Sequence, residues 1–299
     1  MSVMNESWGQ NSLFESIGVT KQDYPMGTLY VVGLPIGNFA DITFRALWVL
    51  AHVDVIAAED TRETRKLLDH YGIHAHLMSV REHNEVEGAR RIVSLLARNK
   101  RVAIVTDAGT PAISDPGAKV VNIVLQKGYR VLPIPGASAV VTAMSAAGCL
   151  SPHFTFVGFL PSTGKVRKQR LQAWLFHREA LVFYEAPHRI LSLLEEIGNI
   201  APERYVVVAR EITKRFETIT RLRGDRLSDW AKQHSPKGEY VIVVDELPKK
   251  ENVWRDSSFA WLQALKSELP TSKLAGIAAK VMGVDRKEVY QWLERQKSK

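Results

Sequence analysis

The chain has 299 residues and a formal net charge of +8, with 45% hydrophobic and 24% charged residues. That length suits two domains that each bury a core, in a composition ordinary for a soluble globular protein. The single cysteine, Cys149, excludes a disulfide framework and a multi-cysteine zinc site, and no apolar stretch reaches the roughly 18 residues that span a bilayer. We expect Cys149 to be a buried packing residue and predict no metal site.

The first 25 residues are polar, without a basic start followed by an apolar core, and so do not resemble a signal peptide. We expect residues 1–25 to form a disordered leader. Together with the lack of an apolar span, this predicts a cytoplasmic protein with no membrane partner.

Strand patterns alternate with helical patterns from Thr28 to Ile134. Runs of β-branched and apolar residues predict strands at 28–33, 53–58, 102–106 and 130–134. Apolar residues at helical spacing predict helices at 43–51, 61–71, 85–99 and 118–127. This alternation is typical of a parallel sheet covered on both faces, and we assign residues 26–135 to such an α/β domain.

The second half of the sequence also predicts strands, but their pattern of apolar and polar residues differs from that of the first half. Strands are predicted at 154–159, 180–184, 205–210, 217–223 and 239–244, with helices after Arg167, Arg189 and Asp225. The segment 217–223 alternates polar and apolar residues, as a strand with one wet face does. Residues 136–247 therefore form, in this interpretation, a second α/β domain with a mixed sheet.

The C-terminal part predicts helices. Residues 247–252 have the composition of a linker, and the extension at 253–299 contains amphipathic segments interrupted at Gly283. Helix, glycine turn and helix form the pattern of a helix-turn-helix. A small helical cap with no role in nucleic-acid binding fits the same spacing.

Three loops rich in glycine and proline follow predicted strands, at residues 33–38, 106–117 and 133–139. Open α/β sheets bind ligands at the carboxyl ends of their strands. Glycine allows close approach of the backbone to a ligand, and proline fixes the loop beforehand. None of the loops matches the dinucleotide or triphosphate fingerprints. They predict a ligand of another kind.

Several motifs, in this order and spacing, resemble those of the tetrapyrrole-methylase superfamily. They are GTLYVVGLPIGNFADITFRAL, AAEDTRETRKLL, VTDAGTPAISDPG, PIPGASA, FVGFLP, YEAPHRI, REITKRFE and KGEYV, and they extend from Gly27 to about Val244. The resemblance implies two α/β domains with S-adenosylmethionine in the cleft between them, plus a small C-terminal helical extension. Within the family, the motifs look like those of methyltransferases that modify a cytidine ribose 2′-hydroxyl in the decoding region of 16S ribosomal RNA. The implied partners are 16S RNA or the small ribosomal subunit, and the implied assembly is a homodimer.

The resemblance also assigns site residues. Those implied to bind the cofactor are Pro35, Asp107, Gly109, Thr110, Ile113, Ser138, Ala139 and Tyr184, together with the backbone near Arg210 and Gly238. From the residue itself, Asp107 suits a polar or cationic part of a ligand, although it can equally cap backbone amides.

A hydroxyl is a poor nucleophile until its proton leaves, so a nearby base or cation would help methyl transfer to it. Polar side chains in the matching loops are candidates: Glu59, Asp60, Arg62, Glu185, His188, Arg189, Glu211 and Lys214. From these we select Glu59, Glu185 and Lys214 as catalytic candidates. A carboxylate at a strand end can instead cap a helix or pair with an arginine, so no base is assigned securely.

Two basic clusters, at 165–170 and 214–226, suit contacts with RNA phosphates, although solvated surface loops have the same composition. The predicted RNA-binding residues are Arg62, Arg65, Lys165, Arg167, Lys168, Arg170, Arg189 and Lys214.

Two other functions remain open from the sequence. One is S-adenosylmethionine-dependent methylation of a small tetrapyrrole, which the basic clusters disfavour. The other is a nucleic-acid-binding regulator that uses the C-terminal helices, which would not need three preformed ligand loops.

Overall fold

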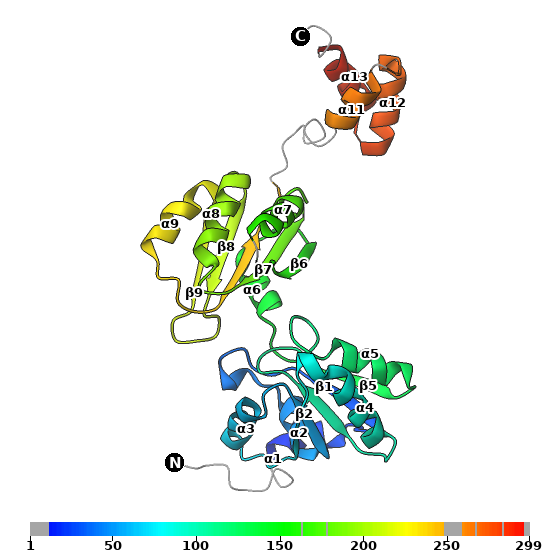
Figure 1. Ribbon diagram of the computed structural model, residues 1–299, viewed down its shortest axis with the longest axis vertical. Coiled ribbons are helices and arrows are strands. Elements are labelled where there is room, and N and C mark those ends of the chain that lie inside the picture. Colours follow the sequence, from blue (N-terminus) through cyan, green and yellow to red (C-terminus); the bar gives the residue numbers. More distant parts are fainter. Residues whose placement is uncertain are drawn as a thin grey trace. The chain divides into compact units, whose positions relative to one another are not determined.

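The computed structural model describes residues 12–162, 164–177, 179–247, 259–266, 268–282 and 284–295. The chain divides by its internal contacts into two compact units, Met1–Glu246 and Leu247–Lys299. Two five-stranded sheets lie in the first unit, and three described helices lie in the second (Figure 1). Among the described helices, none combines the length and apolar character that a membrane span requires.

The first sheet is entirely parallel, as the alternating pattern predicted. Its strands, in spatial order, are β3 (Leu77–Ser79), β2 (Val55–Ala58), β4 (Val102–Val105), β1 (Thr28–Val32) and β5 (Arg130–Ile134). The strands β2 and β4 are buried throughout, which explains their continuous apolar sequences. Because the strands are parallel, the loops that follow them meet at one edge of the sheet.

Helices cover both faces of this sheet. They are α2 (Phe44–His52) and α3 (Thr61–His70) on one face, and α4 (Glu85–Leu96) and α5 (Ala118–Gln126) on the other. Thr43 caps α2 by accepting from the Ala46 amide, and Asp60 caps α3 by accepting from the Arg62 amide. These caps fix where the loop after each strand ends.

The prediction of a disordered leader is wrong for residues 12–25. Helix α1 (Ser12–Ser16) and the 3₁₀ helix Val19–Lys21 pack on the first sheet's core, where Phe14 and Val19 are buried. The Phe14 ring lies 5.7 Å from that of Trp48 in α2. Two apolar residues spaced along a polar segment are a weak sequence signal, although they suffice to anchor it. Residues 1–11 lie outside the described part.

The second sheet is mixed. Its strands, in spatial order, are β6 (Phe154–Phe159), β7 (Ala180–Glu185), β10 (Tyr240–Val244), β8 (Tyr205–Arg210) and β9 (Thr218–Arg223). β6 and β7 are parallel, and the other neighbouring pairs are antiparallel. The mixed sheet predicted for this half is therefore observed.

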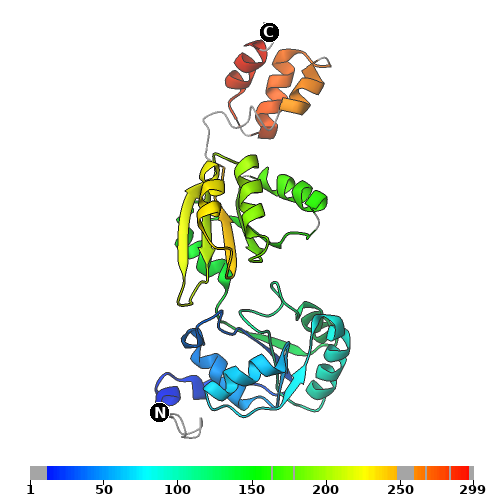
Figure 2. The same ribbon diagram turned by 60° about the vertical axis from the view of Figure 1, so that its left-hand side comes forward.

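Helices also cover the second sheet on both faces (Figure 2). One face packs against α7 (Gly164–Leu175), α8 (Ile190–Ile200) and α9 (Leu227–Gln233), and the other against α6 (Ala139–Ala147). α6 follows directly from the loop after β5, so the chain passes from the first sheet's edge onto the second sheet.

The second unit has its own core. Its helices are α11 (Phe259–Lys266), α12 (Thr271–Met282) and α13 (Arg286–Arg295). Their buried side chains, including Leu262, Leu274 and Trp292, form one cluster. The predicted helical extension is confirmed. Apart from Leu247, the predicted linker lies outside the described residues.

Some elements were not predicted. These are β3, α6 and the short 3₁₀ helices Phe39–Asp41, Glu82–Asn84 and Gly224–Arg226. β3 has only three residues and one fully buried position, so it leaves no apolar run to recognise. The two faces of helix α6 differ little in hydrophobicity, because alanine and serine make up more than half of its residues.

Candidate active site

The three glycine- and proline-rich loops form hydrogen bonds with one another at the carboxyl ends of the first sheet's strands. The Leu34 amide donates to the Gly109 carbonyl oxygen over 2.8 Å, and the Gly109 amide returns a bond over 3.2 Å. Thr110 Oγ1 donates to the carbonyl oxygen of Ala137 over 3.2 Å. Backbone and a hydroxyl thus join the loops after β1, β4 and β5.

Glycines make this close packing possible. A Cβ on Gly33 would lie 2.8 Å from the Cα of Gly136, and a Cβ on Gly136 would lie 2.5 Å from the Gly33 carbonyl oxygen. Gly109 has φ 70°, the left-handed region that glycine enters without steric cost. These loops are therefore fixed by their own backbone geometry.

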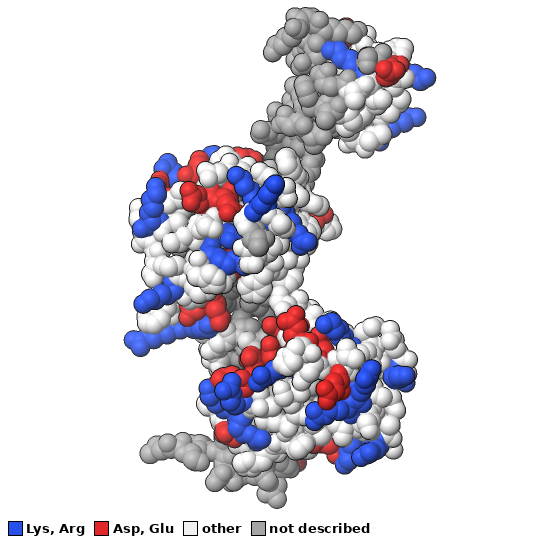
Figure 3. Space-filling view, viewed as in Figure 1, with Lys and Arg blue, Asp and Glu red and all other residues white. Residues whose placement is uncertain are grey.

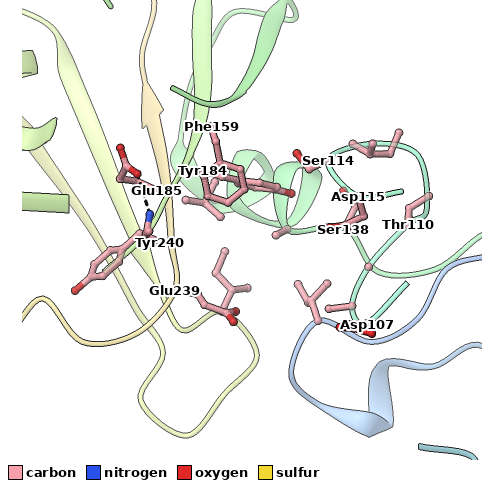
Figure 4. Close-up of a pocket in the computed structure, with 18 of the residues that line it drawn as sticks. Asp107, Thr110, Ser114, Asp115, Ser138, Phe159, Tyr184, Glu185, Glu239 and Tyr240 are labelled. Atoms are coloured by element: carbon pink, nitrogen blue, oxygen red, sulfur yellow. Dashed lines mark hydrogen bonds between the residues drawn. The ribbon is translucent and has the colours of Figure 1, made fainter. Parts of the chain in front are cut away.

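A cavity of about 440 Å³ opens where these loops face the second sheet (Figure 4). Ligand-binding pockets are usually of about this size or larger. The first side of the cavity comes from the loops after β1, β2, β4 and β5, and the other from the ends of β6 and β7 and the start of β10. Among the described residues, no group of three or more His, Cys, Asp or Glu side chains is placed to hold a metal ion.

Most of the residues expected to bind a cofactor line this cavity. They are Asp107, Gly109, Thr110, Ile113, Ser138, Ala139 and Tyr184. Pro35 does not line it. Its carbonyl oxygen instead accepts from the Gly109 amide over 3.4 Å, so its contact holds the loops together.

Other lining residues were not selected from the sequence. They are Ile36, Ala108, Ser114, Asp115, Phe159, Ala186, Pro187, Ile212, Glu239, Tyr240 and Val241. Most lie within or beside the motifs FVGFLP, YEAPHRI and KGEYV, so these motifs carried a signal. The cofactor set follows the family resemblance and the catalytic candidates are chosen among polar side chains, and neither selection includes Phe159 or the apolar wall.

Carboxylates dominate the charge around the cavity. Glu59, Asp107, Asp115 and Glu239 all line it. Burial, followed by the negative charge of Asp107, raises the pKa of Glu59 above its ordinary value. The Asp107 carboxylate accepts from the Asp60 amide over 3.0 Å, so it also ties the loop after β4 to the start of α3.

Glu185, the second catalytic candidate, belongs to a buried ion-pair network. Its carboxylate lies 3.0 Å from Arg189 Nε and 4.0 Å from an Arg167 guanidinium nitrogen. Arg167 also lies 3.4 Å from Glu196. The Glu185 side chain is fully buried. Although Glu185 lines the cavity, its carboxylate balances two arginines, which argues against its role as the base.

The same network corrects two RNA-binding expectations. Arg167 is only 5% exposed, and it donates to Ser192 Oγ over 3.0 Å. Arg189 donates to the carbonyl oxygens of Leu160 and Pro161 over 2.7 and 3.2 Å. Carboxylates, a hydroxyl and carbonyl oxygens of the protein itself are the partners of both guanidinium groups. Neither arginine is therefore presented to an RNA phosphate.

Lys214, the third catalytic candidate, lies between Glu211 and Glu239. Its Nζ is 3.1 Å from Glu211 Oε1 and 2.9 Å from Glu239 Oε2. Burial alone would lower the pKa of Lys214, but the hydrogen bonds to Glu239 and Glu211 outweigh burial and raise it. A lysine held in its charged form does not accept a proton, so the structure argues against its role as a base.

Of the other basic residues in the predicted RNA-binding set, all but one are exposed. Lys165, Lys168 and Arg170 are exposed on α7, and Arg62 is exposed on α3 although it pairs with Asp60. Arg65 is half-buried and donates to the Ala75 carbonyl oxygen. Figure 3 shows Lys and Arg side chains spread over the surface of the first unit, with Asp and Glu side chains gathered between them.

Known proteins match both units of the chain. Residues 28–228 match the family model described as Tetrapyrrole (Corrin/Porphyrin) Methylases, and residues 259–297 match that described as RsmI C-terminal HTH domain. The chain belongs to the tetrapyrrole methylase family.

Curated relatives of this tetrapyrrole methylase share most of its length. The ribosomal RNA small subunit methyltransferase I of Escherichia coli O157:H7 is 44% identical over 278 residues, which is 92% of this chain and 97% of the relative. The protein of the same name from Haemophilus influenzae is 44% identical over 89% of this chain and 96% of its own length. That from Pseudomonas aeruginosa is 44% identical over 90% of this chain and 98% of its own length.

Solved structures show the tetrapyrrole methylase fold at much lower identity. A cobalt precorrin-4 methyltransferase superimposes with a TM-score of 0.55 at 20% identity, covering 75% of this chain and 98% of that chain. A diphthine synthase gives a TM-score of 0.56 at 15% identity, covering 73% and 89%. These likenesses establish the fold of the two sheets.

Two remaining sequence expectations concern single residues. Cys149 is partly buried against the second sheet, and burial, followed by Asp245, raises the pKa of its thiol to about 12. This thiol stays protonated at neutral pH, which suits a packing residue. His188 is exposed and is not among the residues that line the cavity.

Proposed function

We propose that this methylase transfers a methyl group from S-adenosylmethionine to the ribose 2′-hydroxyl of a cytidine in the decoding region of 16S ribosomal RNA. The observation that carries the proposal is the match of about 44% identity to ribosomal RNA small subunit methyltransferases I along nearly the whole chain. The helical second unit is included in this similarity, because residues 259–297 match the corresponding C-terminal domain.

The cavity has the chemistry that S-adenosylmethionine requires. Apolar side chains such as Ile36, Ile212 and Val241 offer a wall for a flat ring. The carboxylates of Asp107 and Asp115 offer negative charge to an ammonium or sulfonium group. Gly109 leaves room for a ligand to approach the backbone, since a Cβ there would contact nothing closer than 3.4 Å.

We assign the cofactor to the residues of the predicted set that line the cavity. Asp107, Gly109, Thr110, Ile113, Ser138, Ala139 and Tyr184 contact it in this proposal. We also place the boundary between the two α/β domains near residue 135, where the chain leaves the first sheet. S-adenosylmethionine supplies a methyl group that its sulfonium already activates, so the protein needs mainly to position the hydroxyl and remove its proton.

We assign proton removal to Glu59. It lines the cavity at the end of β2, and its raised pKa brings it nearer to neutrality than an ordinary glutamate, which favours a general base. Its Oε2 accepts from the Asp107 amide over 3.5 Å, which orients it beside the cofactor loop. The hydroxyl proton passes to this carboxylate as the oxygen gains the methyl group.

Exposed cations near the cavity are the proposed phosphate contacts. Lys165, Lys168 and Arg170 lie on α7, which starts shortly after Phe159 at the cavity edge. Arg62 extends the basic surface on α3. Such contacts position an RNA strand without reading its sequence.

We further propose that the enzyme acts in the cytoplasm, where the small ribosomal subunit is assembled, and that it forms a homodimer. Exposed apolar side chains follow one another along α6, the next turn and the edge strand β6, at Val141, Leu150 and Phe154. Light scattering of the purified protein at several concentrations tests the dimer, and a monomer at micromolar concentration contradicts it.

The reaction is tested with S-adenosylmethionine labelled on its methyl group. The protein is incubated separately with small subunits and with free 16S RNA from cells lacking it, and the modified nucleotide is mapped by its resistance to alkaline cleavage. We expect label on one ribose, and the Asp107→Asn variant should lose cofactor binding and labelling together. Label on a base, or on a small tetrapyrrole in a parallel reaction, contradicts the proposal.

A further inference from the structure

Phe159 is an aromatic side chain at the cavity that the proposed reaction has not yet used. It ends strand β6, is 56% exposed and lines the cavity. Figure 4 shows it beside Tyr184. The two rings lie 5.6 Å apart at 64°, so one edge of Phe159 is supported while much of the ring stays open to solvent.

A β-bulge turns Phe159 toward the cavity. Phe156 pairs with Val182, but Gly158 pairs with Phe183 and Phe159 with Tyr184, so one extra residue of β6 lies between Phe156 and Gly158. If the regular register continued past Phe156 without a bulge, Phe159 would pair with Glu185 instead of Tyr184. Its side chain would then lie on the opposite face of the sheet from Tyr184, because side chains alternate along a strand. Bulges often re-aim a side chain beside an active site.

The backbone supports this re-aiming. Gly158 has φ 72°, which a residue with a side chain rarely adopts. Immediately after Phe159, Arg189 donates to the carbonyl oxygens of Leu160 and Pro161. Arg189 is itself held by Glu185. The buried ion-pair network thus fixes the segment that presents Phe159.

We infer that Phe159 is the stacking surface for the nucleobase whose ribose is methylated. The inference rests on the proposed function and adds the contact that holds the target nucleotide. Proteins that bind single-stranded RNA stack splayed-out bases on aromatic side chains. An exposed ring at the edge of the cofactor cavity would place that base next to the reacting ribose. The helix α7, which carries exposed cations, begins at Gly164, shortly after Phe159 in the chain.

Variants of Phe159 separate stacking from cofactor binding. Phe159→Leu keeps apolar bulk but removes the π face, and Phe159→Trp keeps the face. The matched control is Phe176→Leu, just after the end of α7, where the ring is 82% exposed and does not line the cavity. Since both positions are partly exposed, we expect each variant to fold, which a thermal melt verifies.

For each variant, KM and kcat are measured with small subunits, and the Kd for S-adenosylmethionine is measured by calorimetry. We expect Phe159→Leu to raise KM for RNA by at least about fivefold and up to about a hundredfold, the range found for single base–aromatic stacks. Phe159→Trp should stay within about threefold of wild type, as should the Phe176 variant, and cofactor affinity should not change.

Two results overturn the inference while leaving the proposed function in place. One is an unchanged KM for RNA in Phe159→Leu. The other is a weakened affinity for S-adenosylmethionine at unchanged KM for RNA, which would assign Phe159 to the cofactor. A wild-type protein that labels no RNA overturns the proposed function and the inference together.

Discussion

The edges of the two sheets that face the cavity each carry a glutamate at the end of a buried strand, but in different surroundings. Glu59 follows β2, and burial, followed by the negative charge of Asp107, raises its pKa. Glu185 ends β7 and lies between Arg167 and Arg189. The same sequence feature thus gives a candidate base in one sheet and a structural anion in the other. Partners brought from elsewhere in the chain decide the role.

The two edges are also built differently. In the first sheet, glycines and backbone hydrogen bonds fix the loops, with Gly33 against Gly136 and Leu34 paired with Gly109. In the second sheet, buried charged side chains fix the loops, with Arg189 holding the segment after β6. Backbone therefore preorganises the first sheet's side of the cavity, the cofactor side, which supplies most of the proposed cofactor contacts. Charged side chains support the second sheet's side, the substrate side, which carries Phe159 and α7.

The largest expected effect is at Glu59. Glu59→Gln should lower kcat for RNA methylation by about 100- to 10,000-fold, the usual contribution of a general base, with little change in cofactor affinity. A base acts only when ionised, so wild-type activity should fall as the pH drops through the pKa of Glu59. Because this pKa is raised, the fall should begin at a higher pH than for an ordinary glutamate.

The control for Glu59 is the pH profile of the variant itself. Glu59→Gln should lose the acidic limb of the kcat profile, since the group that titrates has gone. A variant that keeps the acidic limb would assign the proton transfer to another group. A variant with full activity at neutral pH would remove Glu59 from the chemistry.

The second prediction concerns the charged support of the other sheet. Glu185→Gln leaves the buried Arg167 and the partly buried Arg189 without their shared anion, and removing one partner of a buried ion pair typically costs about 3–5 kcal/mol. We expect a loss of that size in the free energy of unfolding, measured by urea denaturation. Glu195→Gln, on the exposed side of α8, should stay within about 0.5 kcal/mol. Equal stability of the two variants would contradict the structural role of Glu185.

The third prediction tests the backbone packing of the cofactor side. In Gly136→Ala the new Cβ would lie 2.5 Å from the Gly33 carbonyl oxygen, so the loops must separate. We expect at least about a tenfold loss of S-adenosylmethionine affinity, because small misplacements of positioning groups have large effects. Gly164→Ala is the control, since a Cβ there meets nothing within 4 Å. Unchanged affinity in Gly136→Ala would show that the loops do not need this contact.

Local sequence patterns predicted the fold well where an element buries a continuous face. The strand at 205–210, in which residues 206–209 are all buried, was predicted with its observed bounds. The pattern failed for the segment at 12–25, where Phe14 and Val19 attach a polar stretch to the core through contacts distant in sequence. Periodicity reports which face a long element buries, but it carries no information on an isolated anchor.

The candidate site divides in the same way. Loops such as that containing Asp107 and Gly109 were recognisable because glycine, proline and strand ends are local features. The burial of Arg167 was not, because it depends on Glu185 and Glu196 from other elements. The basic cluster at 165–170 therefore predicted a larger basic surface than the structure has, because Arg167 is buried. Phe159 was not predicted as a site residue, because its position at the cavity depends on a bulge that the sequence does not reveal.

The smallest expected effect concerns the exposed cations that remain on the substrate side. Lys165→Glu combined with Lys168→Glu should weaken RNA binding severalfold at moderate salt and leave the free energy of unfolding and the cofactor Kd unchanged. Removing one lysine–phosphate interaction should reduce the salt dependence of log K by about 0.7 for a single strand. Filter binding across a salt series measures both the affinity and its salt dependence.

The matched control reverses the same number of charges at the end of the first sheet that faces away from the cavity. Arg98 and Lys127 are exposed and follow the carboxyl ends of α4 and α5, near the amino ends of the strands and away from the cavity. If RNA recognised only net charge, Arg98→Glu with Lys127→Glu would weaken binding as much as the α7 double variant. We expect a smaller loss and an unchanged salt slope, because a phosphate contact requires the cation to lie beside the bound strand.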